Sequence, residues 1–225
     1  MQFELTKEFL DLISDAVESG DKQFIAQKLE GVHAADIAEI LDQVDLEEAQ
    51  FIYHQLEEEL ASDVLVELEE DVRDEFLKSL PTEKIAEQID NMDSDDATDL
   101  IQDLPEYRKE KILSQLEDAD QASDIVSLLS YEEDTAGGLM AKEYIKANIN
   151  WTVEECLEEL RQQAEEIDYV YTIYVVDNHN KLLGTLSLKA FLYSSNDTKI
   201  ENIYMKDPIS VSTDVGDEEV ATIME

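Results

Sequence analysis

Acidic side chains gather in two short stretches of this sequence, and carboxylates at such density attract cations. The first stretch, residues 57–75, holds ten acidic residues against one basic residue, Arg73. Within the second stretch, Asp95 and Asp99 are four residues apart, so on a helix they share a face and can point at one ion. The members of this second stretch are Asp90, Asp93, Asp95, Asp96, Asp99 and Asp103.

The cation that such carboxylates fit best is Mg²⁺. This ion keeps much of its water and takes one or two carboxylates at a site, so a sensor for it needs no His/Cys cluster. It needs carboxylates on two bodies that repel each other when the ion is absent. The alternative interpretation is that these acids form a solvated helix face and serve solubility alone.

Composition and charge exclude several classes of function. The chain has 225 residues, 16 Lys and Arg against 57 Asp and Glu, and a formal charge of −41. Such a surface repels phosphate backbones and anionic lipid headgroups, so no nucleic-acid or peripheral membrane partner is expected. The apolar fraction of 43% is enough for buried cores, and the length favours two domains.

Catalysis and export are not indicated either. Cys156 is the one cysteine, which excludes an internal disulfide and favours a reducing compartment. His33, His54 and His179 are scattered, and no nucleophile or oxyanion motif accompanies the carboxylates. We therefore predict no catalytic residue, no cofactor-binding residue and no enzyme activity. The N-terminus has no signal-peptide pattern, and no window approaches 18 consecutive apolar residues.

Residues 1–130 have a helical pattern throughout. Apolar residues from Phe9 to Val17 mark one helix face, after which Gly20 predicts a stop and Asp21 an N-cap. Short helices then repeat a unit in which a small residue and an Asp precede an aliphatic pair. The four copies are Ala35-Asp36-Ile37-Ala38, Ser62-Asp63-Val64-Leu65, Thr98-Asp99-Leu100-Ile101 and Ser123-Asp124-Ile125-Val126. An Asp near a helix start would favour the macrodipole, which offers a structural explanation for these residues. Units of this kind stack into a helical superhelix.

The pattern changes after Tyr131. Thr152 and Glu155 predict a capping box that opens a helix containing Cys156. The β-branched and aromatic run 169–176, the turn 177–180 and the run 182–187 predict a hairpin, and residues 188–192 a short helix. The start of this pattern recurs from Met205, with a strand expected at 209–211 and a helix from Asp217. Because the second copy lacks its hairpin, we interpret the chain as a fragment.

These strings resemble the cytosolic half of the MgtE magnesium transporters. The most specific is Tyr131-Glu132-Glu133-Asp134-Thr135-Ala136-Gly137-Gly138-Leu139-Met140, which is similar to the family's junction between its helical N domain and its CBS domains. The resemblance implies an α+β fold: an N-terminal all-α right-handed superhelix in residues 1–130, followed by α/β CBS domains of β-α-β-β-α order. The first CBS domain is expected in residues 131–202 and a truncated second one in residues 203–225.

The resemblance also implies which residues bind Mg²⁺. It assigns Asp63, Asp95, Asp99 and the backbone of Gly138 as ligands at the interface of the N and CBS domains, and Glu218 in the second CBS domain. Asp63 stands where the family often has Glu, so its reach is shorter. Gly216 stands where the family can have an acid, so either a ligand is missing there or Asp214 or Asp217 substitutes.

In the family, Mg²⁺ bridges the acidic domains and stabilises a compact form in which the pore is closed. The implied partners are Mg²⁺, a transmembrane pore domain encoded outside this chain, and a second copy through the CBS domains. The implied place is the cytoplasmic side of the cell membrane. Two alternatives stay open: an adenine-nucleotide module, with ATP in a CBS cleft formed by the hairpin and Asp214, and an acidic scaffold for partner proteins.

Overall fold

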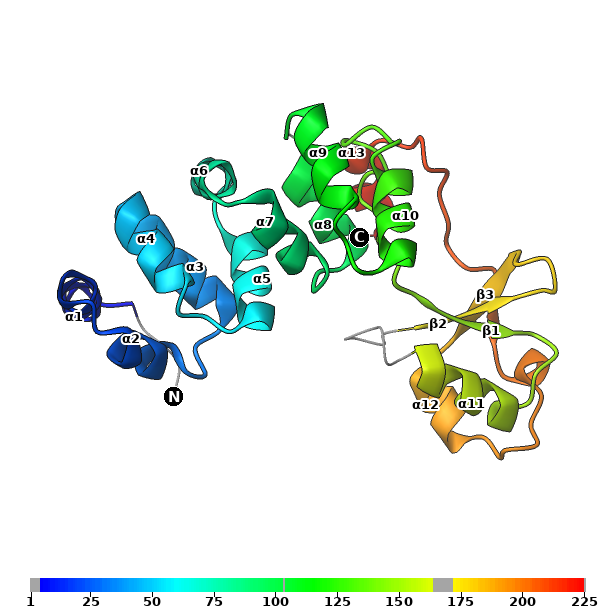
Figure 1. The fold of residues 1–225 in the computed structure, drawn as a ribbon. Coiled ribbons are helices and arrows are strands. Elements are labelled where there is room, and N and C mark those ends of the chain that lie inside the picture. Colours follow the sequence, from blue (N-terminus) through cyan, green and yellow to red (C-terminus); the bar gives the residue numbers. More distant parts are fainter. Residues whose placement is uncertain (1–4, 103, 164–171, 225) are drawn as a thin grey trace. The chain divides into compact units, whose positions relative to one another are not determined.

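A computed structural model describes residues 5–102, 104–163 and 172–224. The chain divides into an N-terminal unit, Met1–Leu129, and a C-terminal unit, Ser130–Glu225 (Figure 1). Each unit has its own hydrophobic core and is described by itself. Asp103 and residues 169–171, which belong to predicted features, lie outside the described residues.

The N-terminal unit is all helical where it is described. Its helices are short and follow one another with brief connections (Figure 1). Their bounds are α1 Lys7–Ser19, α2 Lys22–Leu29, α3 Ala34–Gln43, α4 Leu46–Tyr53, α5 Glu58–Glu67, α6 Glu70–Ser79, α7 Thr82–Ile89, α8 Ser94–Gln102, α9 Glu106–Leu113 and α10 Ala119–Leu128.

The predicted helix boundaries at residues 20 and 21 are confirmed. Gly20 ends α1 in the left-handed conformation, with φ +68°, which glycine adopts without steric cost. The Asp21 carboxylate then accepts a hydrogen bond from the Phe24 amide, 3.1 Å away, and so caps α2. Pro81 and Pro105 directly precede α7 and α9, where a missing amide hydrogen removes no helical hydrogen bond.

The proposed role of the repeated Asp residues as helix starts is wrong for Asp63, Asp99 and Asp124. Only Asp36 lies in the first turn of its helix. The other three lie well inside α5, α8 and α10, because these helices begin several residues earlier than the repeated unit suggests. Other acids fill their first turns, such as Glu58 in α5.

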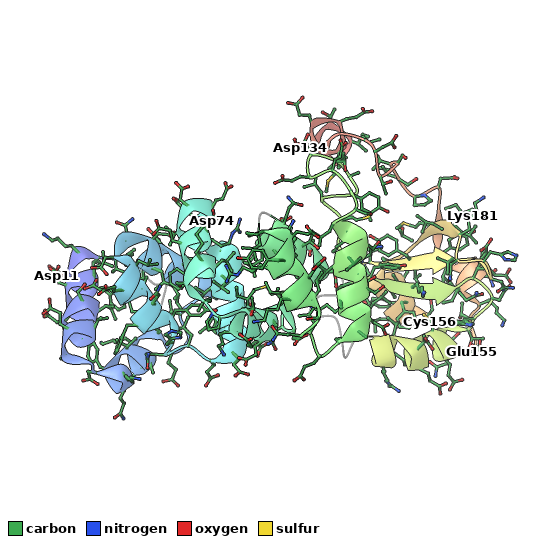
Figure 2. All side chains as sticks on the ribbon, turned by 45° about the horizontal axis from the view of Figure 1, so that its top comes forward. Asp11, Asp74, Asp134, Glu155, Cys156 and Lys181 are labelled. Atoms are coloured by element: carbon green, nitrogen blue, oxygen red, sulfur yellow. The ribbon has the colours of Figure 1, made fainter. Side chains whose placement is uncertain are left out.

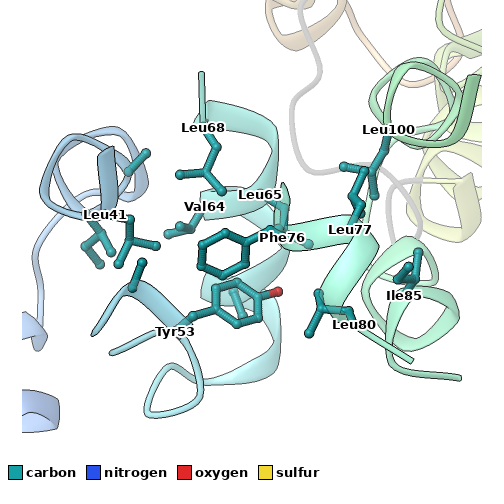
Figure 3. Close-up of a cluster of buried hydrophobic side chains, with 14 of the residues drawn as sticks. Leu41, Tyr53, Val64, Leu65, Leu68, Phe76, Leu77, Leu80, Ile85 and Leu100 are labelled. Atoms are coloured by element: carbon teal, nitrogen blue, oxygen red, sulfur yellow. The ribbon is translucent and has the colours of Figure 1, made fainter. Parts of the chain in front are cut away.

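The core of the N-terminal unit is aliphatic with an aromatic pair at its centre (Figure 3). Tyr53 and Phe76 meet edge to face, with ring centroids 5.4 Å apart. The Tyr53 hydroxyl donates to Oε1 of the fully buried Gln88 at 2.9 Å, and Ser62 Oγ lies 3.3 Å from the same oxygen. Burial raises the pKa of Tyr53, so this hydroxyl stays a neutral donor.

Long polar side chains tie helices together across the repeats. Arg108 of α9 donates to the carbonyl oxygens of Leu77 and Leu80, at 2.6 and 2.8 Å, where α6 ends. Gln121 of α10 repeats this device at the end of α7, donating to Ile89 and Met92 at 2.7 and 2.8 Å. Both satisfy carbonyl groups that a helix end leaves without intrahelical partners.

The C-terminal unit is a small mixed sheet with helices. Its sheet order is β1-β2-β3-β4, in which β1 runs parallel to β2 while β3 is antiparallel to both neighbours. Ile145, Ile173 and Leu186 lie in register across it and are buried. The bounds are β1 Ile145–Asn148, α11 Val153–Gln163, β2 Ile173–Val176, β3 Leu182–Leu186, α12 Leu188–Tyr193, η1 Ile200–Asn202, β4 Met205–Lys206 and α13 Asp217–Met224.

The capping box at Thr152 is confirmed. The Glu155 amide donates to Thr152 Oγ1 at 3.2 Å, and Glu155 Oε2 accepts from the Thr152 amide at 2.7 Å. Two hydrogen bonds donated to Glu155 Oε2, from the Thr152 amide at 2.7 Å and then from the Thr152 hydroxyl at 3.0 Å, lower the pKa of the Glu155 carboxyl group. Cys156 follows and is fully buried (Figure 2), as its apolar helix position predicted.

The segment after residue 202 differs from the expected second copy. Met205–Lys206 forms β4 and pairs with β3, so it belongs to the same sheet as the hairpin. Residues 209–211, predicted as a strand, carry no strand assignment. A strand exists only through its ladder with a partner, and within the described chain these residues have none.

Candidate cation-binding site

Helix α8 presents the predicted Asp pair because of its own amphipathic pattern. Ala97, Leu100 and Ile101 are buried in the core and fix the orientation of the helix. Asp95 is half-buried and Asp99 is exposed, one turn further along. Burial and then the negative charge of Asp95 raise the pKa of Asp99, so the two carboxyl groups interact across one helical turn.

Asp96 is the most perturbed carboxyl group of this cluster. Partial burial and then the charges of Asp95, Asp93 and Asp99 raise its pKa to about 6, with a smaller contribution from Glu67. Burial disfavours the charged form, and each neighbouring anion disfavours it further. A cation at this place would remove that penalty.

Two residues of this cluster were missed as site residues. Asp96 was counted in the acidic stretch but not among the ligands, because its sequence position does not reveal that it is half-buried. Glu67 was missed because it is distant in sequence, yet it acts electrostatically on Asp96. No sequence signal distinguishes either residue from the many other acids.

Asp63 lies on α5, exposed and one helical turn before Glu67. Residues four apart share a helix face, so Asp63 stands on the face through which Glu67 acts on α8. The negative charges around Asp96 therefore come from two helices, α5 and α8. Among the described residues, no group of three or more His, Cys, Asp or Glu side chains is arranged to hold a metal ion. A hydrated Mg²⁺, which needs only one or two carboxylates, fits this donor set; a fully protein-ligated ion does not.

In the C-terminal unit, the segment with Gly138 lies against the loop that precedes α13. The amides of Ala136 and Gly137 donate to the carbonyls of Val215 and Thr213, at 2.7 and 2.9 Å. Thr135 and Gly216 form an isolated bridge. The structure thus brings together the two segments that contain Gly138, Asp214, Asp217 and Glu218, four of the predicted ligands.

Close backbone packing explains the glycines of this segment. A Cβ on Gly138 would lie 2.5 Å from the carbonyl oxygen of Glu133 and 2.6 Å from that of Glu132. A Cβ on Gly137 would collide with the Tyr131 ring. These contacts indicate that Gly137 and Gly138 allow close backbone packing, rather than form a phosphate-binding loop.

The acids beside this segment are exposed. Hydrogen bonds from the Ser212 side chain and from the Asp214 backbone amide lower the pKa of Asp214. The Asp214 carboxylate is therefore ionised at neutral pH. Asp217 and Glu218 lie in the first turn of α13, and Asp217 Oδ1 accepts from the Glu218 amide at 2.7 Å. Negative charge is also favourable at a helix N-terminus, so these positions have a structural reason as well.

The three histidines and the cysteine lie at positions that indicate no catalytic role. His33 precedes α3 without a side-chain capping bond, His54 stacks edge to face on Tyr53, and His179 lies in the hairpin turn. Burial raises the pKa of the Cys156 thiol to about 11, which makes it a poor nucleophile at neutral pH. Along the described residues, no helix is both long and apolar enough to span a membrane.

Comparisons with known proteins point in one direction. The family model for the MgtE intracellular N domain matches residues 32–134, and the model for the CBS domain matches residues 136–196. The magnesium transporter MgtE of Thermus thermophilus is 32% identical over 216 residues, which are 94% of this chain and 48% of that protein. The chain therefore spans about half the length of that relative. MgtE of Enterococcus faecalis is 36% identical over 103 residues, 46% of this chain and 23% of that protein.

Two solved structures are similar to this chain in fold. The cytosolic domain of the Mg²⁺ channel MgtE, crystallised in complex with ATP, superposes with a TM-score of 0.85 at 31% identity, covering 94% of this chain and 86% of that one. The soluble part of a magnesium transporter gives a TM-score of 0.81 at 28% identity, covering 97% of this chain and 86% of that one.

Proposed function

Because the chain belongs to the MgtE family of magnesium transporters, we propose that it senses Mg²⁺ and gates a transmembrane pore. The observation that carries this proposal is the carboxylate cluster on α8, where mutual repulsion and burial raise the pKa of Asp96 to about 6. Such a cluster stores unfavourable electrostatic energy that a bound divalent cation releases.

The mechanism follows from the sign of the charges. Two carboxylates about 4 Å apart repel by roughly 1–4 kcal/mol at effective dielectrics between 80 and 20. Asp63, Asp95 and Asp99 of the N-terminal unit would share Mg²⁺ with Gly138 of the C-terminal unit, and Glu218, with Asp214 or Asp217, would hold a further ion. Bridging ions would convert repulsion between the units into attraction and favour a compact form.

The energy that such a switch requires is modest. Moving a two-state population from about 1:99 to 99:1 needs roughly 5.5 kcal/mol of differential binding. Two or three weak sites, each tighter in the compact form, supply that amount. In the proposed cycle the compact form closes the pore, so high internal Mg²⁺ stops its own entry.

The proposed organisation follows the same family. Residues 1–130 form the N domain, residues 131–202 the first CBS domain and residues 203–225 the start of a second. The partners are Mg²⁺, the transmembrane pore domain and a second copy of the chain through the CBS domains. The chain would act on the cytoplasmic side of the cell membrane, with regulation and no catalysis as its role.

Small-angle scattering tests the proposal. The chain is titrated with MgCl₂ and, separately, with NaCl at matched ionic strength, because general screening also compacts an acidic protein. We expect the radius of gyration to fall with Mg²⁺ beyond the NaCl control. Replacing Asp95→Asn and Asp99→Asn together should raise the Mg²⁺ midpoint by about tenfold, the equivalent of roughly 1.4 kcal/mol. Equal contraction in both salts, or an unchanged midpoint, contradicts the proposal.

Adenine-nucleotide binding is the second candidate function. A structurally similar MgtE cytosolic domain was solved in complex with ATP. In this chain the β2–β3 hairpin and the ionised, exposed Asp214 would contribute to the corresponding cleft. ATP added with excess chelator should then raise the melting temperature reported by Trp151, the single tryptophan. No shift without Mg²⁺ would remove this candidate.

A further inference from the structure

A half-open cavity of about 610 Å³ lies in the N-terminal unit between α2 and the chain that enters α5. Its volume is in the range of small-molecule sites, roughly 300–1,000 Å³. Gln23, Gln27 and Glu30 form one wall, because residues four and seven apart share a helix face. At a rise of about 1.5 Å per residue, this wall is about 10 Å long. Gln55 and Glu57, from the connection between α4 and α5, also line the cavity.

Among the described residues, the charged side chains that line this cavity are acidic. Glu30 and Glu57 are exposed, and within the described chain neither carboxylate has a hydrogen-bonding or ion-pair partner. The two lysines of α2, Lys22 and Lys28, do not line the cavity. Each lies over an aromatic ring instead, with Nζ 5.8 and 5.3 Å from the ring centroid. Both carboxylates are therefore available to a cation from solution.

Glutamine amides supply neutral hydrogen-bond acceptors at the same cavity. Gln55 Nε2 donates to the carbonyl oxygen of Phe51 at 2.6 Å, which fixes this amide and leaves its Oε1 as an acceptor. Gln23 and Gln27 lie on the exposed face of α2. Amide and carboxylate oxygens both accept hydrogen bonds from N–H groups. The lining therefore suits a positively charged ligand that carries N–H donors.

The cavity also has an apolar lining. Leu29 is buried, with 2% of its surface exposed, and Leu56 and Leu60 are half-buried. Hydrated inorganic cations gain nothing from apolar surface, whereas a ligand with methylene groups does. Lysine side chains show this combination in proteins, because their apolar stems lie along hydrophobic surface while the ammonium group stays in water. The ligand that fits the cavity therefore combines N–H donors with a methylene chain.

We propose that this cavity binds a linear polyamine, with ammonium groups at Glu30 and Glu57 and the methylene chain on the three leucines. An extended triamine such as spermidine is comparable in length to the α2 wall. The formal charge of −41 attracts such a polycation toward the chain. A basic peptide fits the cavity less well, because a stable protein interface buries about 800 Å² on each partner. The site shares no residue with the proposed Mg²⁺ ligands and does not depend on Mg²⁺ sensing.

Nuclear magnetic resonance gives a readout confined to the cavity. The chain is labelled with ¹⁵N, and the side-chain amide signals of Gln23, Gln27 and Gln55 are followed without Mg²⁺ in about 150 mM NaCl, which screens remote charges. Spermidine is the probe. Hexaamminecobalt(III) is the matched ligand control, because it carries the same triple positive charge and N–H donors but has no methylene chain.

Two double variants separate binding in the cavity from general attraction. Glu30→Gln with Glu57→Gln removes both carboxylates of the cavity. Glu47→Gln with Glu59→Gln removes the same charge from exposed residues of α4 and α5 that do not line the cavity. A further variant, Ala26→Phe, fills the cavity from the exposed face of α2 without changing the charge.

We expect spermidine to shift the three amide signals with a midpoint at least about threefold lower than that of hexaamminecobalt(III), because its methylene groups contact the leucines. The cavity double variant should raise the spermidine midpoint by about three- to tenfold, since exposed ion pairs contribute modestly. Ala26→Phe should raise it similarly, and the control double variant by less than about twofold, because remote charges are screened.

Equal midpoints for the two probes in the unmodified chain would show general attraction of trivalent cations and overturn the proposal, whether or not the variants fold. Equal effects of the two double variants would overturn it as well. A lysine-rich peptide that shifts these signals where spermidine does not would identify a protein-binding groove instead. None of these measurements involves Mg²⁺ or the α8 carboxylates, so failure here is distinct from failure of the proposed function.

Discussion

The properties of single carboxyl groups in this chain depend on which other acids surround them. Asp96 and Asp99 have raised pKa values because burial and neighbouring anions disfavour their charged forms. Glu83 of α7 shows the opposite: hydrogen bonds from Lys111, from its own backbone and from Gln115 lower its pKa to about 2. The carboxyl groups of this chain therefore divide into those that resist ionisation and those that are stabilised as anions.

Replacement of Asp96 by Asn should stabilise the N-terminal unit at neutral pH. The folded pKa of about 6 exceeds the ordinary value of 3.8, so ionisation costs folding free energy. The favourable contribution of Asp96 is present below the unfolded pKa and is lost as the pH rises through about 6. We expect Asp96→Asn to raise the free energy of unfolding by roughly 1–2 kcal/mol at pH 7.5, after solvent screening.

The gain should fall close to zero near pH 3, below the ordinary value of 3.8, where Asp96 is mostly protonated in both states. Chemical denaturation followed by circular dichroism at the two pH values measures it. Asp71→Asn, at an exposed position of α6, is the control for removing one charge from an acidic protein. A variant that is equally stabilised at both pH values, or destabilised at pH 7.5, contradicts the assignment.

At the scale of elements, the backbone amides and carbonyls left unpaired at helix ends form hydrogen bonds with side chains. Some of these side chains are near in the sequence and others are distant. Asp21, Asp45 and Asp118 cap the helices that follow them, and each accepts a hydrogen bond from a first-turn amide. Arg108 and Gln121 instead come from helices later in the chain and bind the ends of α6 and α7. The first kind of contact is local, whereas the second stabilises the stacking of the repeats.

The capping box of α11 offers a prediction at this scale. Thr152→Ala removes the hydroxyl that accepts the Glu155 amide and should cost about 1 kcal/mol of stability in the C-terminal unit. Trp151 precedes the box and is the single tryptophan, so its fluorescence reports unfolding of this unit. Thr152→Ser should retain most of the stability. Equal losses in both variants would mean that the methyl group, and not the cap, matters.

At the scale of the whole chain, self-repulsion is the dominant electrostatic property. A formal charge of −41 opposes compaction, and acidic side chains such as that of Asp11 project outward (Figure 2). The two units have separate cores, so each resists this repulsion with its own buried surface.

Raising NaCl from about 10 to 150 mM should therefore increase the melting temperature of the N-terminal unit by roughly 3–6 °C, as repulsion is screened. Mg²⁺ at equal ionic strength should add a further increase, because a bound divalent ion neutralises particular carboxylates. Circular dichroism follows the helical unit, and Trp151 fluorescence follows the other. A melting temperature that is independent of NaCl would show that self-repulsion is not a significant cost.

Local sequence determined the features that depend on near neighbours. The helix stop at Gly20, the cap at Asp21, the capping box at Thr152 and the hairpin around residues 177–180 were predicted and are present, because each needs only contacts within a few residues. The α+β fold and the family were likewise predicted and are confirmed. The assigned Mg²⁺ ligands stay predictions.

Only the tertiary structure decided which acids influence one another. Asp96 stands out among 57 acidic residues because packing half-buries it and brings the charge of Glu67 within range. The sequence also did not predict that β4 pairs with β3 or that Asp63 lies inside α5. Electrostatic interactions and strand ladders act through space between residues far apart in the chain, and their distances are fixed only when the helices and strands pack.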